Sequence, residues 1–449
     1  MKNPFKTRTI TPILLLLQSG IMLFFGILVI VNGDLAFRLL HWVAGISLLV
    51  AGISRAWAMF WEKKQLQGVI TLTAFTLGGA VMVLFPLVVA VSVGKLFGLW
   101  FLINSIAHGT ICVQCVTQKL RGKVRYGFSA LFSLIFGLLL VFGDHLHLKS
   151  IFMLSGIYLL VYALTLLVDA VSEVFLYGKA GTGIKRRVRI SLPLFITALL
   201  PGKLLDDFNE YFKTNPKEAT KVLENSVHPS GERMPLEVFI HLSDKGTQRT
   251  GHVDLRYRHT VYSYGCYDHH SHRYNGMLSD GTMVVCDSEK YVNYCITAEE
   301  KILVGFGLAL SPEQCTAIEG ELAKIRKNLL PWQSDYEKGL LTDNTKDWDA
   351  ASLLIHSTGC KIHKMSSGPF RKYYALNTNC VKLAEQIIGP SGIGLIDVNG
   401  ICVPGTYYTL LNDLYERSDT IVVQRNIYKK MTEEEHNHVA TSDDSPRKN

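Results

Sequence analysis

A cysteine and a histidine stand where their side chains could form a catalytic pair. Cys380 follows Thr378 and Asn379 and opens a run with apolar residues at helical spacing: Val381, Ala384, Ile387 and Ile388. This pattern predicts a thiol at a helix start, where unpaired backbone N–H groups and the helix dipole favour the thiolate. Far upstream, Gly251 and His252 open a strand-like segment and supply a candidate base. A thiolate with an imidazole base indicates a cysteine hydrolase or an acyltransferase.

The segments that must position this pair read as an α+β domain with an antiparallel sheet. Alternating apolar residues predict strands at 236–242, 251–257, 260–264, 282–286 and 302–308, with a tight turn at 258–259. Ser311, Pro312 and Gln314 form a capping box, which predicts a helix to about Lys327. A last short helix is expected after Gly405. About 200 residues suffice for one hydrophobic core.

A catalytic histidine needs a further polar group that fixes the tautomer of its ring. The hairpin that turns at 258–259 places the strand partner of His252 near Gly265. We therefore expect the orienting group among three nearby residues: Tyr264, Asp268 and His269. Each assignment in the pair has a structural alternative, because Cys380 could be a packing cysteine and His252 a polar cap at a strand start.

The soluble half of the chain resembles the circularly permuted papain-like superfamily, which includes lecithin:retinol-acyltransferase-like and permuted NlpC-type cysteine hydrolases. The resemblance rests on three short segments, Gly-His-Val at 251–253, Val-Tyr-Ser-Tyr-Gly at 261–265 and Asn-Cys-Val-Lys-Leu at 379–383. Histidine before cysteine is the permuted order. Over about 234–415, the resemblance implies Cys380 as nucleophile, His252 as general base, and an acyl-enzyme that water or another acceptor resolves.

The first half of the chain alternates long apolar runs with short polar breaks. Because a bilayer needs roughly 20 apolar residues per helix, we expect six transmembrane spans: about 11–32, 35–60, 68–85, 87–116, 126–143 and 149–177. Lysine and arginine gather before the first span and after the second, fourth and sixth. The positive-inside rule then predicts a multi-pass protein of the inner (plasma) membrane with both termini in the cytoplasm.

Six spans in three tight hairpins resemble the HdeD-like acid-resistance membrane domain over about residues 8–178, with small residues such as Gly45, Gly52 and Gly137. The expected regions are an HdeD-like transmembrane domain at 1–178, a basic and amphipathic linker at 179–233, a permuted papain-like domain at 234–428 and a disordered tail at 429–449. A cytoplasmic soluble half argues against a disulfide framework, although the chain has nine cysteines.

The partners expected from these patterns are membrane lipids and a peptide, amide or lipid-ester substrate. The net charge of +8 lies partly in the inner loops, where it indicates membrane orientation rather than nucleic-acid binding. No phosphate-binding loop is present in the sequence, and no cofactor is expected. The oligomeric state is left open.

A histidine-rich segment offers a rival chemistry. Residues 268–272 read Asp-His-His-Ser-His, and Cys266 adds a soft ligand, so a zinc site is conceivable. The segment lacks the helical spacing of zinc peptidases, and we expect a solvated loop without a metal. Two functions stay open: a membrane-tethered cysteine hydrolase or acyltransferase, or a stress- or acid-response membrane protein whose soluble domain is a non-catalytic binding or sensing module.

Overall fold

The computed structural model describes residues 12–59, 65–117, 123–143, short pieces between 152 and 167, and 234–242, 251–341, 344–375, 378–389, 404–416 and 420–430. The chain divides into two compact units, one formed by Ile10–Leu176 and the other by Tyr177–Asn449 with Met1–Thr9. The predicted linker at 179–233 and almost all of the predicted tail lie outside the described residues.

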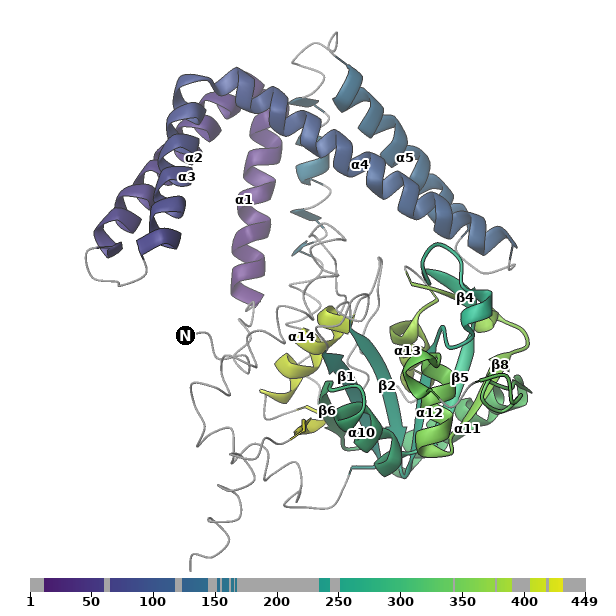
Figure 1. Cartoon of the computed structure of the whole chain (residues 1–449). Helices are drawn as coiled ribbons and strands as arrows, with labels where there is room; N and C mark the ends of the chain where they lie inside the picture. Colours follow the sequence, from purple (N-terminus) through teal and green to yellow (C-terminus); the bar gives the residue numbers. More distant parts are fainter. Residues whose placement is uncertain are drawn as a thin grey trace, which may run out of the picture. The chain divides into compact units, whose positions relative to one another are not determined.

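The described part of the first unit includes five long helices (Figure 1): α1 (Pro12–Val31), α2 (Gly33–Met59), α3 (Gln65–Leu84), α4 (Pro86–Thr117) and α5 (Lys123–Phe142). Among the described residues, three segments are long and apolar enough to cross a membrane: Gly33–Arg55, Pro86–Thr117 and Lys123–Phe142. Leu16–Val31 and Val69–Leu84 are shorter apolar helices. Most of the sixth predicted span lies outside the described residues, so the count of six stays a prediction.

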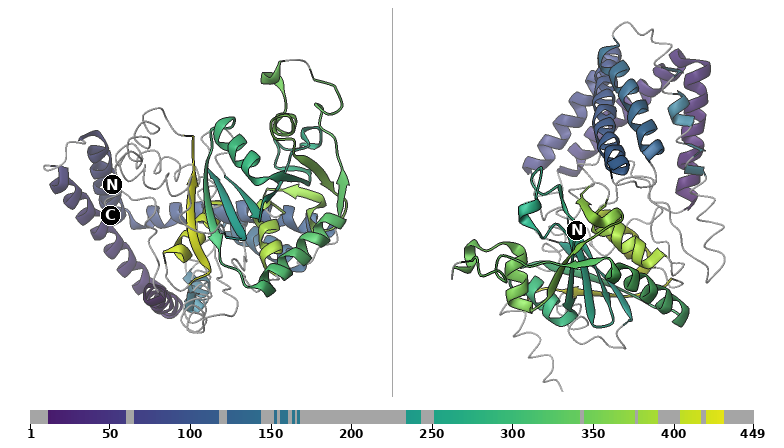
Figure 2. Two further views of the ribbon diagram at one scale, coloured as in Figure 1. Left: turned by 90° about the horizontal axis from the view of Figure 1, so that it is seen from below. Right: turned by 90° about the vertical axis from the view of Figure 1, so that its right-hand side faces the viewer.

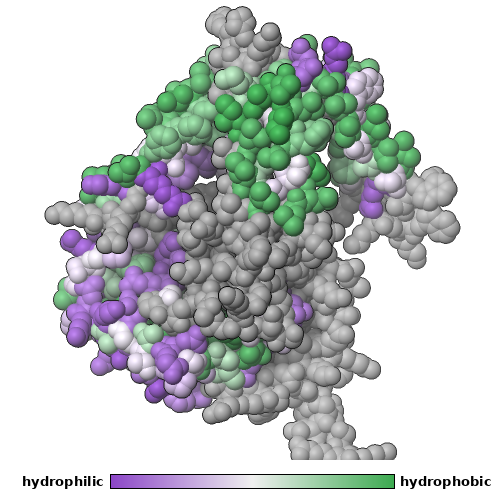
Figure 3. All heavy atoms as spheres, turned by 180° about the vertical axis from the view of Figure 1, so that it is seen from behind, coloured by the Kyte–Doolittle hydropathy of each residue, from purple (hydrophilic) through white to green (hydrophobic). Residues whose placement is uncertain are grey.

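These helices expose large apolar side chains along their length. Val31, Ile106 and Val124 are 77%, 69% and 78% exposed, and Figure 3 shows hydrophobic side chains over much of the helical surface. A water-soluble helical unit would turn such side chains inward. The exposed apolar surface and the helix lengths together are those of an integral membrane protein.

Glycines bring the helices of each hairpin close together. A Cβ atom built on Gly79 of α3 would lie 2.9 Å from the carbonyl oxygen of Gly45 on α2. In α4 and α5, a Cβ on Gly137 would lie 3.0 Å from the carbonyl oxygen of Gly98. Small residues let membrane helices approach backbone to backbone, which strengthens their van der Waals contact.

The second unit is built on an antiparallel eight-stranded sheet, and Figure 2 shows its twist from two further directions. Its strand order is β10-β6-β1-β2-β3-β5-β8-β7. The bounds are β1 (Leu236–Leu242), β2 (His252–Tyr257), β3 (Thr260–Gly265), β5 (Thr282–Asp287), β6 (Ile302–Leu308), β7 (Leu329–Pro331), β8 (Lys361–Met365) and β10 (Val422–Tyr428). A separate two-stranded sheet pairs β4 (Leu278–Asp280) with β9 (Lys372–Tyr374).

Helices cover both faces of the large sheet. They are α10 (Ser288–Thr297), α11 (Pro312–Lys327), α12 (Ala350–Thr358), α13 (Cys380–Ile388) and α14 (Pro404–Tyr415), with short 3₁₀ turns η2 (His269–Ser271), η3 (Thr345–Asp347) and η4 (Pro369–Arg371). Val238 and Ile240 of β1 pack in one core with α11, α13 and α14. Phe239, between them, packs in a second core with α10 and α12. The period of two along β1 thus divides its side chains between two cores.

The last described strand covers an edge of the sheet. β10 pairs antiparallel with β6, from Val422 opposite Leu308 to Tyr428 opposite Leu303. All seven residues of β6 are buried. Because β1 occupies the other side of β6, β6 becomes an interior strand only when β10 is in place.

Several predicted elements are confirmed. β1 and β6 have the predicted bounds, and the capping box of α11 is present, with the Ser311 N–H donating to Gln314 Oε1 at 2.9 Å. β2 and β3 form the predicted hairpin, in which Asp254 lies opposite Ser263. The sequence did not predict α10, α12 or the strands β4, β7, β8, β9 and β10, nor the short 3₁₀ turns.

Candidate active site

Cys380 is the first residue of α13, as the apolar spacing predicts. Asn379 caps the helix: its side-chain oxygen accepts the Lys382 N–H at 3.1 Å, and its amide donates to the Ala375 carbonyl at 2.9 Å. The cap fixes where the helix begins and therefore where the thiol stands. Cys380 is 5% exposed, and its helix packs against β2 and β3.

His252 is the first residue of β2, the strand against which the Cys380 helix packs. Its Nε2 atom lies 2.9 Å from Asp254 Oδ1 and 3.0 Å from Ser263 Oγ. The Ser263 hydroxyl in turn is 2.7 Å from the Tyr267 hydroxyl. Because His252 is the first residue of β2, no earlier residue of that strand covers its ring. The ring can therefore contact both the polar groups of Asp254 and Ser263 and the start of α13.

Asp254 is the residue that holds this arrangement together. Its fully buried carboxylate contacts three groups: His252 Nε2, His241 Nε2 at 2.7 Å and the Tyr291 hydroxyl at 2.6 Å. His252 and Asp254 are two residues apart on β2 and therefore share a face of the sheet. His241 lies opposite His252 on β1. The carboxylate is thus clamped between two imidazoles from adjacent strands.

The electrostatics of the group favour an ion pair between Asp254 and His252. Burial disfavours the charged ring, but the charges of Asp254 and Cys380, with hydrogen bonds to both, hold the pKa of His252 well above its ordinary 6.5. Burial also disfavours the carboxylate, yet His252 and His241 hold the pKa of Asp254 well below 3.8. For His241 burial dominates and lowers the pKa, so this ring stays neutral.

The three residues predicted to orient His252, which are Tyr264, Asp268 and His269, each contact a different partner. Tyr264 is buried near the thiol: burial, and then the charge of Cys380, raise the pKa of its hydroxyl, which donates to the Phe370 carbonyl at 2.9 Å. Asp268 pairs with Lys364 at 2.6 Å. His269 lies 3.5 Å from the carboxylate of Asp335.

The carboxylate at the His252 ring is therefore Asp254, which the sequence reasoning missed. The sequence prediction places this partner across the hairpin, whereas in the structure it stands two residues further along the same strand. The alternation of side chains along β2 was the signal that could have found it. Of the candidates named for orienting His252, Tyr264 donates its hydroxyl to the Phe370 carbonyl and Asp268 contacts Lys364.

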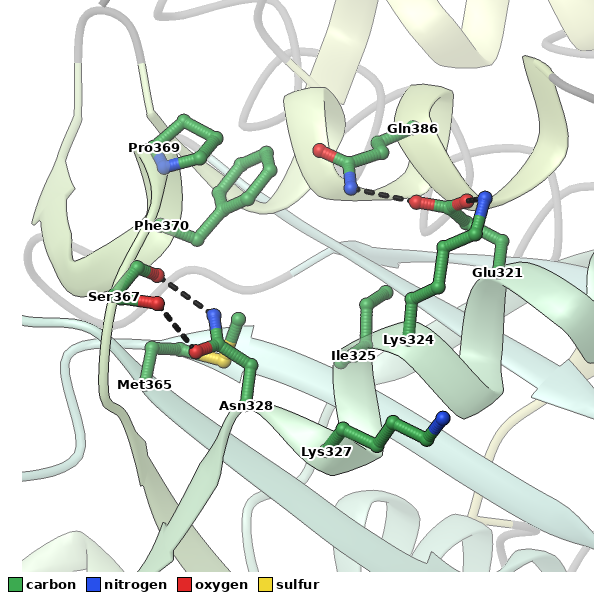
Figure 4. A pocket seen from close by; sticks show the side chains of 10 residues that line it. All are labelled: Glu321, Lys324, Ile325, Lys327, Asn328, Met365, Ser367, Pro369, Phe370 and Gln386. Carbon is green, nitrogen blue, oxygen red and sulfur yellow. Dashed lines mark hydrogen bonds and ion pairs between the residues drawn. The ribbon is translucent and has the colours of Figure 1, made fainter. Parts of the chain in front are cut away.

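A pocket of about 400 Å³ opens between α11, α13 and the β8–η4 segment (Figure 4). Its lining includes Glu321 and Gln386, which are hydrogen-bonded to each other at 2.7 Å, and Asn328. Gln386 lies six residues after Cys380 on α13, roughly 9 Å along the helix axis at 1.5 Å per residue. The pocket shares Phe370 with the surroundings of Tyr264, but it is separate from the thiol.

Comparisons with known proteins gave a match only within the first unit, which is formed by Ile10–Leu176 and is called the membrane unit below. Searches of curated proteins and of solved structures gave no match for the chain. Residues 17–76 and 73–142 each match a short repeat of unknown function, DUF308. These two segments span α1 to α5 and leave the Cys380 unit unmatched. The N-terminal helices are therefore similar to two successive copies of this repeat.

Proposed function

We propose that the second unit, whose sheet and helices lie within residues 236–428 and which is called the soluble unit below, is a thiol hydrolase or acyltransferase of the permuted papain-like type. It would cleave an amide or an ester through an acyl-enzyme on Cys380. One observation carries the proposal: a buried carboxylate, Asp254, holds the ring of His252, and the pKa of that ring responds to the Cys380 thiol at a helix start. Nucleophile, base and orienting group are the parts that such catalysis needs.

In the proposed mechanism the two ring nitrogens of His252 have different roles. Nε2 is held by Asp254 and Ser263, and in the charged ring Nδ1 carries the proton that the Cys380 thiol has given up. The Cys380 sulfur then attacks the substrate carbonyl carbon, and the carbonyl π electrons move to oxygen. Backbone N–H groups at the start of α13 stabilise that oxyanion. Collapse expels the amine or alcohol, which takes the proton from Nδ1, and leaves a thioester on Cys380.

The second half of the reaction uses the same groups. Water or another acceptor, held near His252, gives its proton to Nδ1 as its oxygen or nitrogen attacks the thioester. The sulfur leaves as the thiolate and the acid or the new ester or amide departs. Asp254 stabilises the imidazolium that forms in each half, because its carboxylate carries a full negative charge 2.9 Å from Nε2.

The predicted membrane topology narrows the class of acyl donor that the soluble unit can reach. Positive charge in the predicted inner loops supports six spans and cytoplasmic termini, which would place the soluble unit at the inner face of the membrane. The intact cell wall lies on the opposite side of that membrane. A cytoplasmic unit tethered at the bilayer therefore favours a lipid ester, a cell-wall precursor or a protein tail as the acyl donor.

A second candidate function rests on the DUF308 repeats. In that case the chain is a stress- or acid-response membrane protein, and the soluble unit is a binding or sensing module without turnover. Asp254 and His252 would then be a structural ion pair, since buried charges are normally paired whatever the function.

Site-by-site alkylation of the full-length protein distinguishes the two functions. Cys360 is the matched control because it is 6% exposed, against 5% for Cys380. For an enzyme we expect iodoacetamide to modify Cys380 at least about tenfold faster than Cys360 at pH 7, since the thiolate is the reactive species. His252→Ala should abolish that difference. Equal rates for the two cysteines in the unaltered protein would leave only the binding-module function.

A further inference from the structure

Two histidines and an aspartate converge at η2. His269 and His270 are adjacent on η2, and their ring centroids are 3.9 Å apart. Both Nε2 atoms face one oxygen of Asp335, at 3.5 Å for His269 and 2.9 Å for His270. One ligand atom from each of the three residues lies within 4.8 Å of the others.

These separations are close to what a tetrahedral zinc ion needs. Zinc binds imidazole nitrogens and carboxylate oxygens at roughly 2.0–2.2 Å, which puts neighbouring ligand atoms about 3.3–3.5 Å apart. The 3.5 Å between His269 and Asp335 already fits. The 2.9 Å between His270 and Asp335 requires an opening of about half an ångström, which exposed side chains allow. His270 is 61% exposed along its side chain.

A second carboxylate lies near the other ring nitrogen of His269, and a shift of about half an ångström or more would bring it within hydrogen-bond distance. Asp349 Oδ1 faces the other nitrogen of His269, Nδ1, at 3.8 Å. Asp349 is itself anchored, because it caps α12 by accepting the Ser352 N–H at 3.0 Å. Histidines that bind metals commonly direct their second ring nitrogen at a carboxylate, which fixes the tautomer and the ring orientation.

The backbone that carries the two histidines is also held in place. The Ser271 hydroxyl donates to the Asp268 carbonyl at 2.8 Å and accepts the Asp280 N–H at 2.9 Å. The Asp268 side chain is tied to Lys364. The ligand atoms therefore come from an ordered turn, and a metal ion would lose little affinity to the ordering of a loose loop.

We propose that His269 Nε2, His270 Nε2 and the Asp335 carboxylate form a binding site for Zn²⁺ or a similar divalent first-row ion, with Asp349 as the positioning carboxylate. Imidazole ligands select such ions over Mg²⁺ and Ca²⁺. The fourth position is left to water or to a ligand from solvent. The ion would join η2 to the segment of Asp335, 65 residues further along the chain from His270.

Lys338 is the cation that the ion would displace. Its Nζ lies 3.4 Å from Asp335 Oδ1, so the carboxylate is partly neutralised without a metal. Lys338 is 38% exposed and can turn into solvent when the ion arrives. This inference stands apart from the proposed thiol chemistry, because none of its residues contacts Cys380 or His252 among the described residues.

The test uses the full-length protein in detergent and titrates Zn²⁺ against a chromophoric chelator, with Co²⁺ absorption as a second readout. We expect one ion per chain at this site and visible bands typical of four-coordinate Co²⁺. His269→Ala and His270→Ala should each weaken that binding by about a hundredfold or more. Asp349→Asn should weaken it by about 10–100-fold, the usual effect of an outer carboxylate, while asparagine still caps α12.

His272→Ala is the matched control. His272 is an exposed histidine of the same segment whose Nε2 contacts the Cys266 carbonyl at 2.8 Å, and it lies outside the cluster. Its removal should change the affinity less than about twofold, since its ring supplies no ligand in this geometry. The proposal is overturned if the unaltered protein binds no Zn²⁺, or if the His269 and His270 variants bind as tightly as His272→Ala. The latter result would place the ion elsewhere in the chain.

Discussion

Asp254→Asn tests the electrostatic centre of the soluble unit. Asparagine keeps the shape of the side chain but removes the charge and replaces one oxygen with an N–H donor. Either orientation of the amide then sets a donor against an N–H group of His252 or His241, which now meet the two carboxylate oxygens at 2.9 and 2.7 Å. The variant loses a charge-assisted hydrogen bond and leaves a buried donor unpaired.

The cost follows from the burial of the group. Asp254 is 1% exposed, so solvent cannot replace the lost partner. A buried pair broken at one member costs about 3–5 kcal/mol, and asparagine keeps some of the hydrogen bonding, so we expect about 3 kcal/mol. With a urea dependence of about 2 kcal/mol per molar, the midpoint of unfolding falls by about 1.5 M.

The assay must follow the soluble unit alone in a chain that also carries membrane helices. Buried cysteines serve this purpose: Cys295 and Cys360 are 1% and 6% exposed, so we expect their alkylation to be much faster once their unit unfolds. Their alkylation in increasing urea, read by mass spectrometry, gives the unfolding curve. Asp287→Asn is the control, because Asp287 caps α10 and asparagine is an equal cap, so its midpoint should stay unchanged.

The shifted pKa values of His252 and Asp254 predict that the loss of stability in Asp254→Asn depends on pH. The pKa of His252 is raised above 6.5 in the folded protein, so the stability that this ring contributes is complete below 6.5 and is lost as pH rises through the higher value. The pKa of Asp254 is lowered, so its contribution is complete above 3.8 and is lost only in stronger acid. The difference between Asp254→Asn and the unaltered protein should therefore be larger at pH 6 than at pH 10. A variant that unfolds at the same urea concentration at pH 6 would refute the pairing.

Three further changes test other parts of the structure. Cys380→Ala should abolish turnover of any acyl substrate while the urea midpoint moves by less than about 1 M, and retained turnover would exclude the thioester mechanism. Arg256→Met should cost about 3–5 kcal/mol in the same urea assay, because it leaves Glu237 buried without the guanidinium now 2.9 Å away. Gly79→Leu should lower the thermal stability of the membrane helices in detergent, because the new side chain meets the Gly45 carbonyl, whereas Gly94→Leu, with nothing within 4 Å, should not.

Local patterns in the sequence were enough to predict many elements of the soluble unit. β1 and β6 were predictable because alternating apolar residues on a buried strand leave a clear period of two. The start of α11 was predictable because a capping box has a fixed spacing. α10 was not, because its residues 288–297 are about as polar as they are apolar and its cap, Asp287, is also the last residue of β5.

The candidate sites show where such patterns stop being sufficient. Cys380 at a helix start follows from a local motif, but its proximity to His252 depends on how α13 packs against β2, over a separation of 128 residues. Asp254 is predictable from the alternation of side chains along β2, whereas the hairpin pairing points to residues of the opposite strand. Asp335 and Asp349 could not be found from the histidine segment, since only tertiary packing brings them to η2.

The place of β10 in the sheet has a consequence for the synthesis of the protein. β6 carries the segment Ile-Leu-Val-Gly-Phe-Gly-Leu, and β10 covers its outer edge from more than a hundred residues further along the chain. Until the ribosome has released residue 428, a nascent chain displays an unpaired apolar strand edge, the kind that recruits other strands. Prematurely terminated chains would keep that edge permanently. Messages cut short before codon 422 should therefore yield chains that aggregate and are degraded, rather than shortened proteins with a working soluble unit.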